Sequence, residues 1–223
     1  MTSPKSPQSI AGLVRAALAG VASPVIVEAG VHYAESTRGI MSACRGVPRY
    51  FGFEPDPRNI VRIKAAIPKL PFPLILIEKA LGEVNGDLTF HQSEGNCYQN
   101  NREMTGAGSI CKPQYVLQKH PWITFEKQIT VKCVTLDTFC SAKKVKAIDF
   151  IWADLQGAEY RMLRGATKIL RTTKAILLEY SEHELYAGQR SLTDCLALLR
   201  RSGDWKLIQR FRCDAFFANM GIW

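Results

Sequence analysis

Apolar and polar residues alternate along the chain with two periods, one typical of buried strands and one typical of amphipathic helices. Continuous apolar runs predict five strands, at 25–29, 49–54, 74–78, 147–154 and 175–180. The segments around them have the spacing of amphipathic helices, at 10–23, 35–44, 57–67, 157–170 and 191–202. This order predicts an α/β fold, in which a mostly parallel sheet is covered by helices on both faces.

Further strands complete the predicted sheet and its surroundings. Residues 86–91 and 129–136 predict two strands, the first of them antiparallel, and Asp137 is expected to cap a short helix that follows. The closing strands, 205–211 and 213–219, are joined by so little chain that we predict an antiparallel hairpin at the sheet edge. With this hairpin the predicted sheet has seven strands.

Two segments lie outside the alternation. Residues 1–9 are rich in Pro and Ser and predict a disordered leader, which leaves 10–223 as a single domain. The stretch 92–128 is polar and irregular, so we expect a substrate-side insert there, at the ligand-binding end of the sheet. Its candidate stacking surfaces for a substrate are Tyr98, Tyr115 and Trp122.

The charge balance and the cysteines narrow the class of protein. Lys and Arg number 29 against 20 Asp and Glu, and this net charge of +9 favours anionic partners, although the basic residues are scattered. Seven cysteines form no CxxC pair and are odd in number, a pattern that favours free thiols and hence the cytoplasm. No apolar run approaches the roughly 18 residues of a membrane span, so we expect a soluble chain.

The loop after the first strand is a candidate ligand site, because ligands of open α/β sheets bind outside the carboxyl ends of the strands. Residues 25–37 read VIVEAGVHYAEST, with the single Gly30 in place of the GxGxxG that a dinucleotide requires. Glu28 precedes this glycine and would repel a diphosphate. S-adenosylmethionine has a cationic end and no phosphate, so it fits better. The simpler alternative is that Glu28 is a solvated residue at the strand end.

The loop after the second strand strengthens the case for an adenosyl cofactor. Glu54 ends that strand, 26 residues after Glu28, where a carboxylate can accept both hydroxyls of an adenosine ribose. NAD-binding proteins use an acid in the same place. Only the combination of Glu54 with an acidic first loop therefore favours S-adenosylmethionine.

Several stretches of the sequence resemble, in order, the FkbM-type methyltransferases, a branch of the class I S-adenosylmethionine-dependent enzymes. EAGVHYAEST is similar to the family's first motif, an acid followed by Gly-x-Asn-x-Gly-x-x-Thr. The later blocks are similar to FGFEPDPRN (51–59), KALGEVNGDLTF (79–90), VTLDTF (134–139) and DFIWADLQGAEYRMLRGA (149–166). His32 and Ala34 replace the motif's Asn and second Gly, and Trp152 and Gln156 stand where many members have Lys and Glu. The resemblance covers residues 25–219 and implies a Rossmann-like class I methyltransferase fold.

The resemblance also implies a cofactor site and two catalytic candidates. The residues that it places against S-adenosylmethionine are Glu28, Gly30, His32, Ala34, Thr37, Glu54, Ala80, Leu81 and Asp154. Asp154 either orients the nucleophile and accepts its proton or caps the helix that follows. His183 is a second candidate base, because an imidazole titrates near neutral pH, or else an ordinary exposed histidine. Metal-ligating atoms are present on Asp154, Glu179, Glu182 and His183, but the spacing of these residues does not demand a metal, and we predict none.

The function implied by the resemblance is transfer of a methyl group to a hydroxyl of a sugar, a glycan or a small natural product. An RNA ribose 2′-O-methyltransferase is the first alternative, and the net charge would suit it. It requires a contiguous basic surface leading to Asp154, and no basic run flanks the neighbouring strands. A non-catalytic nucleoside-binding module is the second alternative. The departures from the family motifs are consistent with it, whereas the retained acids argue against it.

Overall fold

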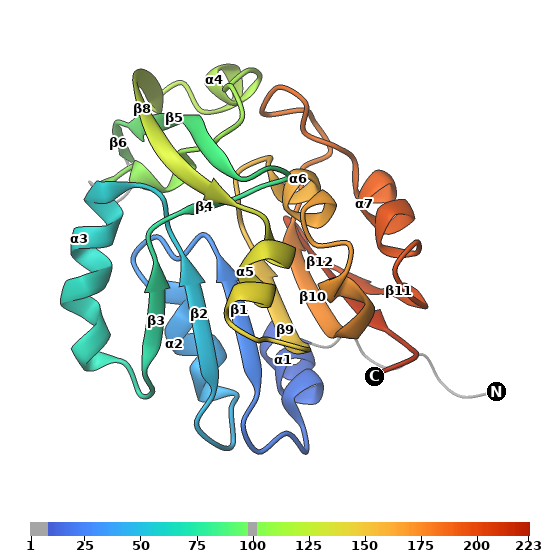
Figure 1. The fold of residues 1–223 in the computed structure, drawn as a ribbon. Coiled ribbons are helices and arrows are strands. Elements are labelled where there is room, and N and C mark those ends of the chain that lie inside the picture. Colours follow the sequence, from blue (N-terminus) through green and yellow to red (C-terminus); the bar gives the residue numbers. More distant parts are fainter. Residues whose placement is uncertain (1–8, 98–101) are drawn as a thin grey trace.

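The computed structural model describes residues 9–97 and 102–223, and its main element is a seven-stranded sheet (Figure 1). The strand order is β11-β12-β10-β9-β1-β2-β3. The parallel strands are β1 (Val25–Ala29), β2 (Arg49–Phe53), β3 (Leu74–Ile77), β9 (Ile148–Ala153) and β10 (Thr173–Glu179). β12 (Asp214–Asn219) pairs antiparallel with β10 and with the edge strand β11 (Trp205–Arg210). The predicted mostly parallel α/β sheet with an antiparallel edge hairpin is therefore confirmed.

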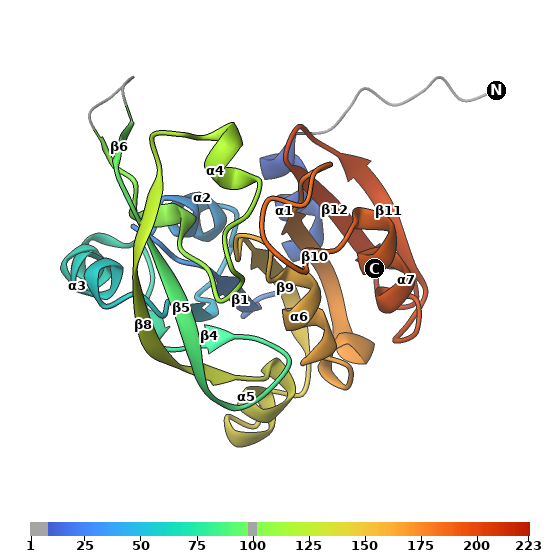
Figure 2. The same ribbon diagram turned by 90° about the horizontal axis from the view of Figure 1, so that it is seen from above.

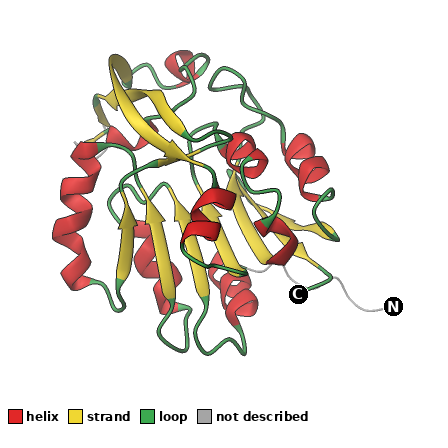
Figure 3. Ribbon diagram, in the orientation of Figure 1, coloured by secondary structure: helices red, strands yellow, loops and turns green. Residues whose placement is uncertain are grey.

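Helices cover both faces of the sheet, as Figures 2 and 3 show. One face is covered by α1 (Ile10–Leu18), α2 (Glu35–Ser42) and α3 (Pro57–Ala66), and η1 (Ile67–Lys69) continues α3. The other face is covered by α5 (Leu136–Ala142), α6 (Glu159–Arg164) and α7 (Leu192–Leu199). Successive residues of β1 alternate between the two cores: Ile26 packs with α1 and α2, and Val27 packs with α5 and α6.

Side-chain caps explain where several helices begin. Ser9 accepts the N–H of Gly12 at 3.1 Å and starts α1. Asp56 caps α3, whose first residue is a proline, and Ser191 starts α7. α1 ends earlier than the predicted 10–23 helix, because the chain leaves the helix at Ala19 and Gly20 takes a left-handed φ of 77°.

A second, three-stranded sheet lies over the carboxyl ends of the main strands (Figure 1). It consists of β4 (Ala80–Leu81), β5 (Gly86–Glu94) and β8 (Thr124–Val134). β5 and β8 pair from Gly86 opposite Cys133 to Glu94 opposite Thr124. Both strands therefore extend into the stretch 92–128, which was expected to be irregular. The pattern missed this extension because most side chains in the first half of β8 are exposed and polar.

The remaining part of the insert contains short elements, namely β6 (Asn96–Cys97), β7 (Arg102–Glu103), η2 (Thr105–Ala107) and α4 (Val116–Lys119). These elements lie between the end of β5 and the start of β8. Of the three aromatic residues expected to stack on a substrate, Tyr98 lies outside the described residues, as do residues 1–8 of the expected leader.

The helix predicted over 157–170 is present but shorter than expected, because α6 stops at Arg164 and a 3-10 helix, η3 (Ile169–Thr172), follows. At Gly165 an added Cβ would lie 2.1 Å from the carbonyl oxygen of Gly82, so this turn admits only glycine. Asp137 accepts the backbone N–H groups of Lys168 and Ile169 and thus stabilises the start of η3. The cap of α5 is Thr135, not the predicted Asp137.

Candidate functional site

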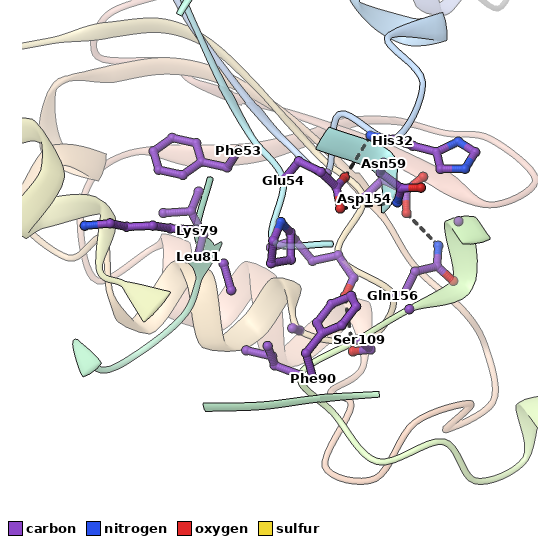
Figure 4. A pocket seen from close by; sticks show the side chains of 18 of the residues that line it. His32, Phe53, Glu54, Asn59, Lys79, Leu81, Phe90, Ser109, Asp154 and Gln156 are labelled. Atoms are coloured by element: carbon purple, nitrogen blue, oxygen red, sulfur yellow. Dashed lines mark hydrogen bonds between the residues drawn. The ribbon is translucent and has the colours of Figure 1, made fainter. Parts of the chain in front are cut away.

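A pocket opens at the carboxyl ends of β1, β2 and β9, where the strand arrangement predicts ligand binding. Gly30, Glu54 and Asp154, which follow these three strands, all line it. Figure 4 shows the side chains of Glu54 and Asp154 in the pocket. We call this cavity the central pocket. The expected site residues His32, Ala80 and Leu81 line it as well.

Gly30 allows the ends of β1 and β9 to meet. Its φ is +89°, and a Cβ at this position would lie 2.0 Å from the carbonyl oxygen of Asp154. Backbone bonds hold the junction together: Gly30 donates to Phe53, and Asp154 donates to Ala29, both at 3.0 Å. The lone glycine of the loop is therefore required by contact between strand ends.

Glu54 is held rigidly at the floor of the pocket. Its Oε2 accepts the backbone N–H of His32 at 2.9 Å, and its Oε1 accepts the N–H of Asp56 at 3.0 Å and Nδ2 of Asn59 at 3.3 Å. Burial raises the pKa of Glu54 to about 7. Asn59 also lines the pocket, and its Oδ1 is buried with no hydrogen-bond partner among the described residues.

Glu28 lies behind the central pocket and does not line it. Its side chain is fully buried, which excludes a solvated strand-end residue. It points toward α2, where its Oε2 accepts hydrogen bonds from Thr37 Oγ1 at 2.5 Å and from the Tyr50 hydroxyl at 2.9 Å. Burial raises the pKa of Glu28 to about 8, so this carboxyl group is mostly neutral at pH 7.

His32 and Ala34 shape the loop through their backbone. Both have positive φ angles, 51° and 61°, in the left-handed region that Asn and Gly adopt more readily. The FkbM-type motif has Asn and Gly at these two positions. His32 lines the pocket with its Nε2 3.2 Å from Thr105 Oγ1, whereas Ala34 and Thr37 are buried beside the pocket and do not line it.

Apolar side chains form the wall opposite the carboxylates. They are Phe53, Ala80, Leu81, Phe90 and Ile110, of which Phe53, Leu81 and Phe90 are labelled in Figure 4. Ala80 and Leu81 belong to the short strand β4, which the second sheet places above the main sheet. The pocket thus combines one apolar wall with carboxylate groups at its floor and side, an arrangement typical of small-molecule sites.

Asp154 belongs to a hydrogen-bonded cluster. Gln156 Nε2 donates to Asp154 Oδ1 at 2.6 Å and to Glu179 Oε2 at 2.8 Å. The Tyr186 hydroxyl donates to the carbonyl oxygen of Ala107 at 2.7 Å and lies 3.2 Å from Gln156 Oε1. The alternative role of Asp154 as a helix cap is not observed.

The carboxylate that stabilises the start of α6 is instead Glu159, which accepts the N–H of Leu155 at 2.7 Å. Burial raises the pKa of Glu159 to about 7. Asp154 therefore does not cap α6. It accepts the hydrogen bond from Gln156 and lines the pocket.

A second cavity adjoins the central pocket, and we call it the side groove. Gly106 and Gln156 line both cavities. The side groove continues past Trp122, Glu179, His183 and Arg212.

The remaining candidates from the sequence lie in or near this groove. His183 is exposed on the rim, outside the central pocket, with its ring 5.3 Å from that of Tyr115. Trp122 lines the groove, whereas Tyr115 does not. In the described part of the chain, no group of three or more His, Cys, Asp or Glu side chains is arranged to hold a metal ion.

Sequence reasoning missed four residues of the site: Asn59, Thr105, Glu179 and Tyr186. Asn59 lies in the first turn of α3, whereas Glu54 lies before that helix, so no helical spacing connects the two residues. Thr105 and Tyr186 reach the site from distant loops, and no local pattern marks them. Glu179 was considered only as a metal ligand.

Comparison with solved structures defines the class of fold. The fold is similar to the crystal structure of methyltransferase FkbM from Methylobacillus flagellatus KT, with a TM-score of 0.57 and 14% sequence identity. The alignment covers 88% of this chain and 43% of that chain, so this chain spans less than half the length of that protein. The architecture is that of the class I methyltransferases.

Sequence comparison then gives the family. Residues 28–204 match the sequence model of the methyltransferase FkbM domain. The chain is also 36% identical over 176 residues to the 2-O-methyltransferase NoeI of Sinorhizobium fredii. The aligned residues cover 79% of this chain and 71% of that protein. The chain belongs to the FkbM methyltransferase family and is a methyltransferase. Within residues 9–97 and 102–223, no helix has the length and hydrophobicity needed to cross a membrane.

Proposed function

We propose that this methyltransferase uses S-adenosylmethionine and methylates a hydroxyl oxygen of a sugar or another small hydroxylated molecule. The observation that carries the proposal is the central pocket, which places Glu54 and Asp154 at the ends of neighbouring strands around Gly30. The name of the relative from Sinorhizobium fredii, a 2-O-methyltransferase, favours oxygen as the methyl acceptor.

The residues present fit an adenosyl cofactor. Glu54 is fixed by three donors and retains lone pairs for the two ribose hydroxyls. Asn59 Oδ1, buried and without a partner among the described residues, offers a further acceptor beside it. Phe53 and Leu81 give an apolar surface for the adenine ring. When bound, the cofactor supplies an electrophilic methyl group on a sulfonium ion.

Asp154 is suited to the charged end of such a cofactor. Asp154 lines the pocket, and its carboxylate orientation is fixed by Gln156, which also lines the side groove. Glu28, Ala34 and Thr37, which the family resemblance also places against the cofactor, do not line the pocket, so their contact with it stays a prediction.

We assign the side groove to the methyl acceptor, because it meets the central pocket at Gly106 and Gln156. Trp122 provides an aromatic surface of the kind on which sugar rings stack, and polar side chains supply hydrogen-bonding groups. His183, on the rim, stays a candidate to contact the acceptor or to take its proton.

Calorimetric titration with S-adenosylmethionine, S-adenosylhomocysteine and NAD tests the cofactor. We expect micromolar binding of both adenosyl compounds and none of NAD. Glu54→Ala should weaken adenosyl binding by about 10- to 100-fold, the worth of charge-assisted hydrogen bonds of about 1.5–3 kcal/mol. The matched control is Glu78→Ala, an exposed acid paired with Lys64, which should bind normally. Binding of NAD alone would overturn the assignment.

Transfer of a labelled methyl group tests the acceptor. Monosaccharides, their glycosides, hydroxylated natural products and short RNA serve as acceptors, and Trp122→Ala should raise the KM of the true acceptor without changing cofactor affinity. Incorporation into RNA alone would replace the sugar proposal by the RNA ribose alternative. Tight cofactor binding with an unreactive pocket would favour the nucleoside-binding module.

A further inference from the structure

Two carboxyl groups and one amide form the boundary between the two cavities. Asp154 lines the central pocket, Glu179 lines the side groove, and Gln156 lines both. The amide nitrogen of Gln156 lies 2.6 Å from Asp154 and 2.8 Å from Glu179, so it directs one N–H toward each carboxyl group. Gln156 has a left-handed φ of 52°, which indicates that the surrounding contacts hold it in place.

The two carboxyl groups share one donor, the amide nitrogen of Gln156, so their negative charges lie close together and oppose ionisation of both at once. Burial, with the nearby negative charge of Asp154, raises the pKa of Glu179 well above its ordinary value. Glu159 from α6 and Asp214 from β12 act in the same direction.

The groups on the groove side are mixed in charge. Arg212, from the turn before β12, and His183 line the same groove, as do Tyr180 and Tyr186. Among these, Tyr186 has a pKa raised strongly by its burial, so it remains a hydrogen-bond donor and does not serve as a base.

We propose that Glu179 is the catalytic carboxylate that takes the proton of the acceptor hydroxyl, and that Gln156 positions it between the two cavities. This inference rests on the proposed function. Glu179 is the carboxyl group of the cluster that faces the assigned acceptor groove, whereas Asp154 faces the central pocket. His183 is exposed, packs against Tyr115 and does not line the central pocket.

The reaction balances with this assignment. The acceptor oxygen forms a bond to the methyl carbon, the carbon–sulfur bond breaks with its electron pair remaining on sulfur, and the hydroxyl proton passes to Glu179. One positive charge on sulfur and one negative charge on Glu179 disappear together. The proton affinity of Glu179 therefore rises at the moment when the proton arrives, because the neighbouring positive charge is lost in the same step.

This assignment requires that Glu179 be ionised when the cationic cofactor is bound, and the sulfonium charge favours that form. S-adenosylmethionine carries the sulfonium charge, and S-adenosylhomocysteine has the same adenosine and amino acid parts without it. Proton changes at Glu54 caused by the ribose are common to both ligands and cancel in their difference. The extra proton released with S-adenosylmethionine therefore reports on the groups that sense the sulfonium charge.

Calorimetry in buffers of different ionisation enthalpy at pH 7 measures this difference without any acceptor. The wild-type protein should release up to about one more proton with S-adenosylmethionine than with S-adenosylhomocysteine. Glu179→Gln should lose most of this difference and still bind S-adenosylhomocysteine, whereas Glu126→Gln, an exposed control on β8, should keep it. Equal proton release for both ligands in the wild type, or an unchanged difference in Glu179→Gln, would overturn the inference. Failure of both ligands to bind would instead overturn the proposed function.

Turnover gives a second test once an acceptor has been found by methyl transfer. Glu179→Gln should lower kcat by about 100-fold or more, the usual contribution of a general base, with cofactor affinity within a few fold of normal. The fall of kcat at low pH should also disappear in this variant. A variant with normal kcat and the wild-type pH profile would show that Glu179 takes no part in the proton transfer.

Discussion

The buried carboxyl group of Glu28 makes the stability of this protein depend on pH in a way that one substitution isolates. The group is fully buried and accepts two hydrogen bonds on Oε2, from Thr37 and Tyr50. Its Oε1 is buried and has no partner among the described residues. Burial therefore dominates, and it raises the pKa from 4.5 to about 8.

The sign of the effect follows from the two pKa values. The folded-state pKa is the higher one, so the unfolded chain releases this proton first as the pH rises. The contribution of Glu28 is fully present below about pH 4.5 and is lost progressively up to about pH 8. Between pH 5 and pH 8 the calculated loss from this group is about 3 kcal/mol.

Glu28→Gln removes the titration and retains the shape of the side chain. The free energy of unfolding of the variant, minus that of the wild type, should increase by about 3 kcal/mol from pH 5 to pH 8. The other buried acids are the same in both proteins and cancel. The amide N–H at the position of Oε1 has no acceptor, which lowers the stability of the variant by a similar amount at each pH.

Urea denaturation at pH 5, 6, 7 and 8 measures this difference. Glu78→Gln, at an exposed acid, is the matched control and should give a curve parallel to the wild type. If the Glu28→Gln and wild-type curves are also parallel, Glu28 ionises in the folded protein at little cost, and the burial argument is refuted.

Two further substitutions test the junctions around the site. Gly30→Ala introduces a Cβ 2.0 Å from the carbonyl oxygen of Asp154 at a φ of +89°, so we expect a loss of at least about 2 kcal/mol in denaturation and weaker cofactor binding in calorimetry. Gly39→Ala, in α2 with nothing within 4 Å of the new Cβ, is the control and should stabilise the protein slightly. Tyr186→Phe leaves the carbonyl oxygen of Ala107 without its donor and should cost about 1–3 kcal/mol, and an unchanged midpoint would contradict this reading of the loop packing.

The main sheet could be predicted because its strands are apolar runs with helical spacing between them. The meeting of Gly30, Glu54 and Asp154 followed from the same reasoning, since carboxyl ends of neighbouring parallel strands lie at one edge. The break after Arg164 could not be predicted, because it depends on the contact between Gly165 and the distant Gly82.

The site was harder to predict where contacts join distant parts of the chain. Gln156 and Glu179 are 23 positions apart and belong to different elements, so no spacing rule connects them. The orientation of Glu28 was also hidden, because alternation along β1 shows that it faces the same side as Ile26 but does not show which helix covers that side. The sequence argument placed its charge at the loop mouth, whereas the carboxyl group is buried against α2 and is mostly neutral at pH 7.

The two cavities differ in the structural elements that line them. The central pocket takes both of its carboxylates from the ends of β2 and β9, whereas the side groove takes much of its lining from residues 116–123 and 180–189, outside the main sheet. Loops tolerate substitution and insertion far better than the strands that they connect. Within the proposed function, acceptor choice can therefore diverge among relatives while the methyl-donor site is inherited unchanged. A combinatorial library restricted to 116–123 and 180–189 leaves the lining of the central pocket unchanged and offers a route to new acceptors.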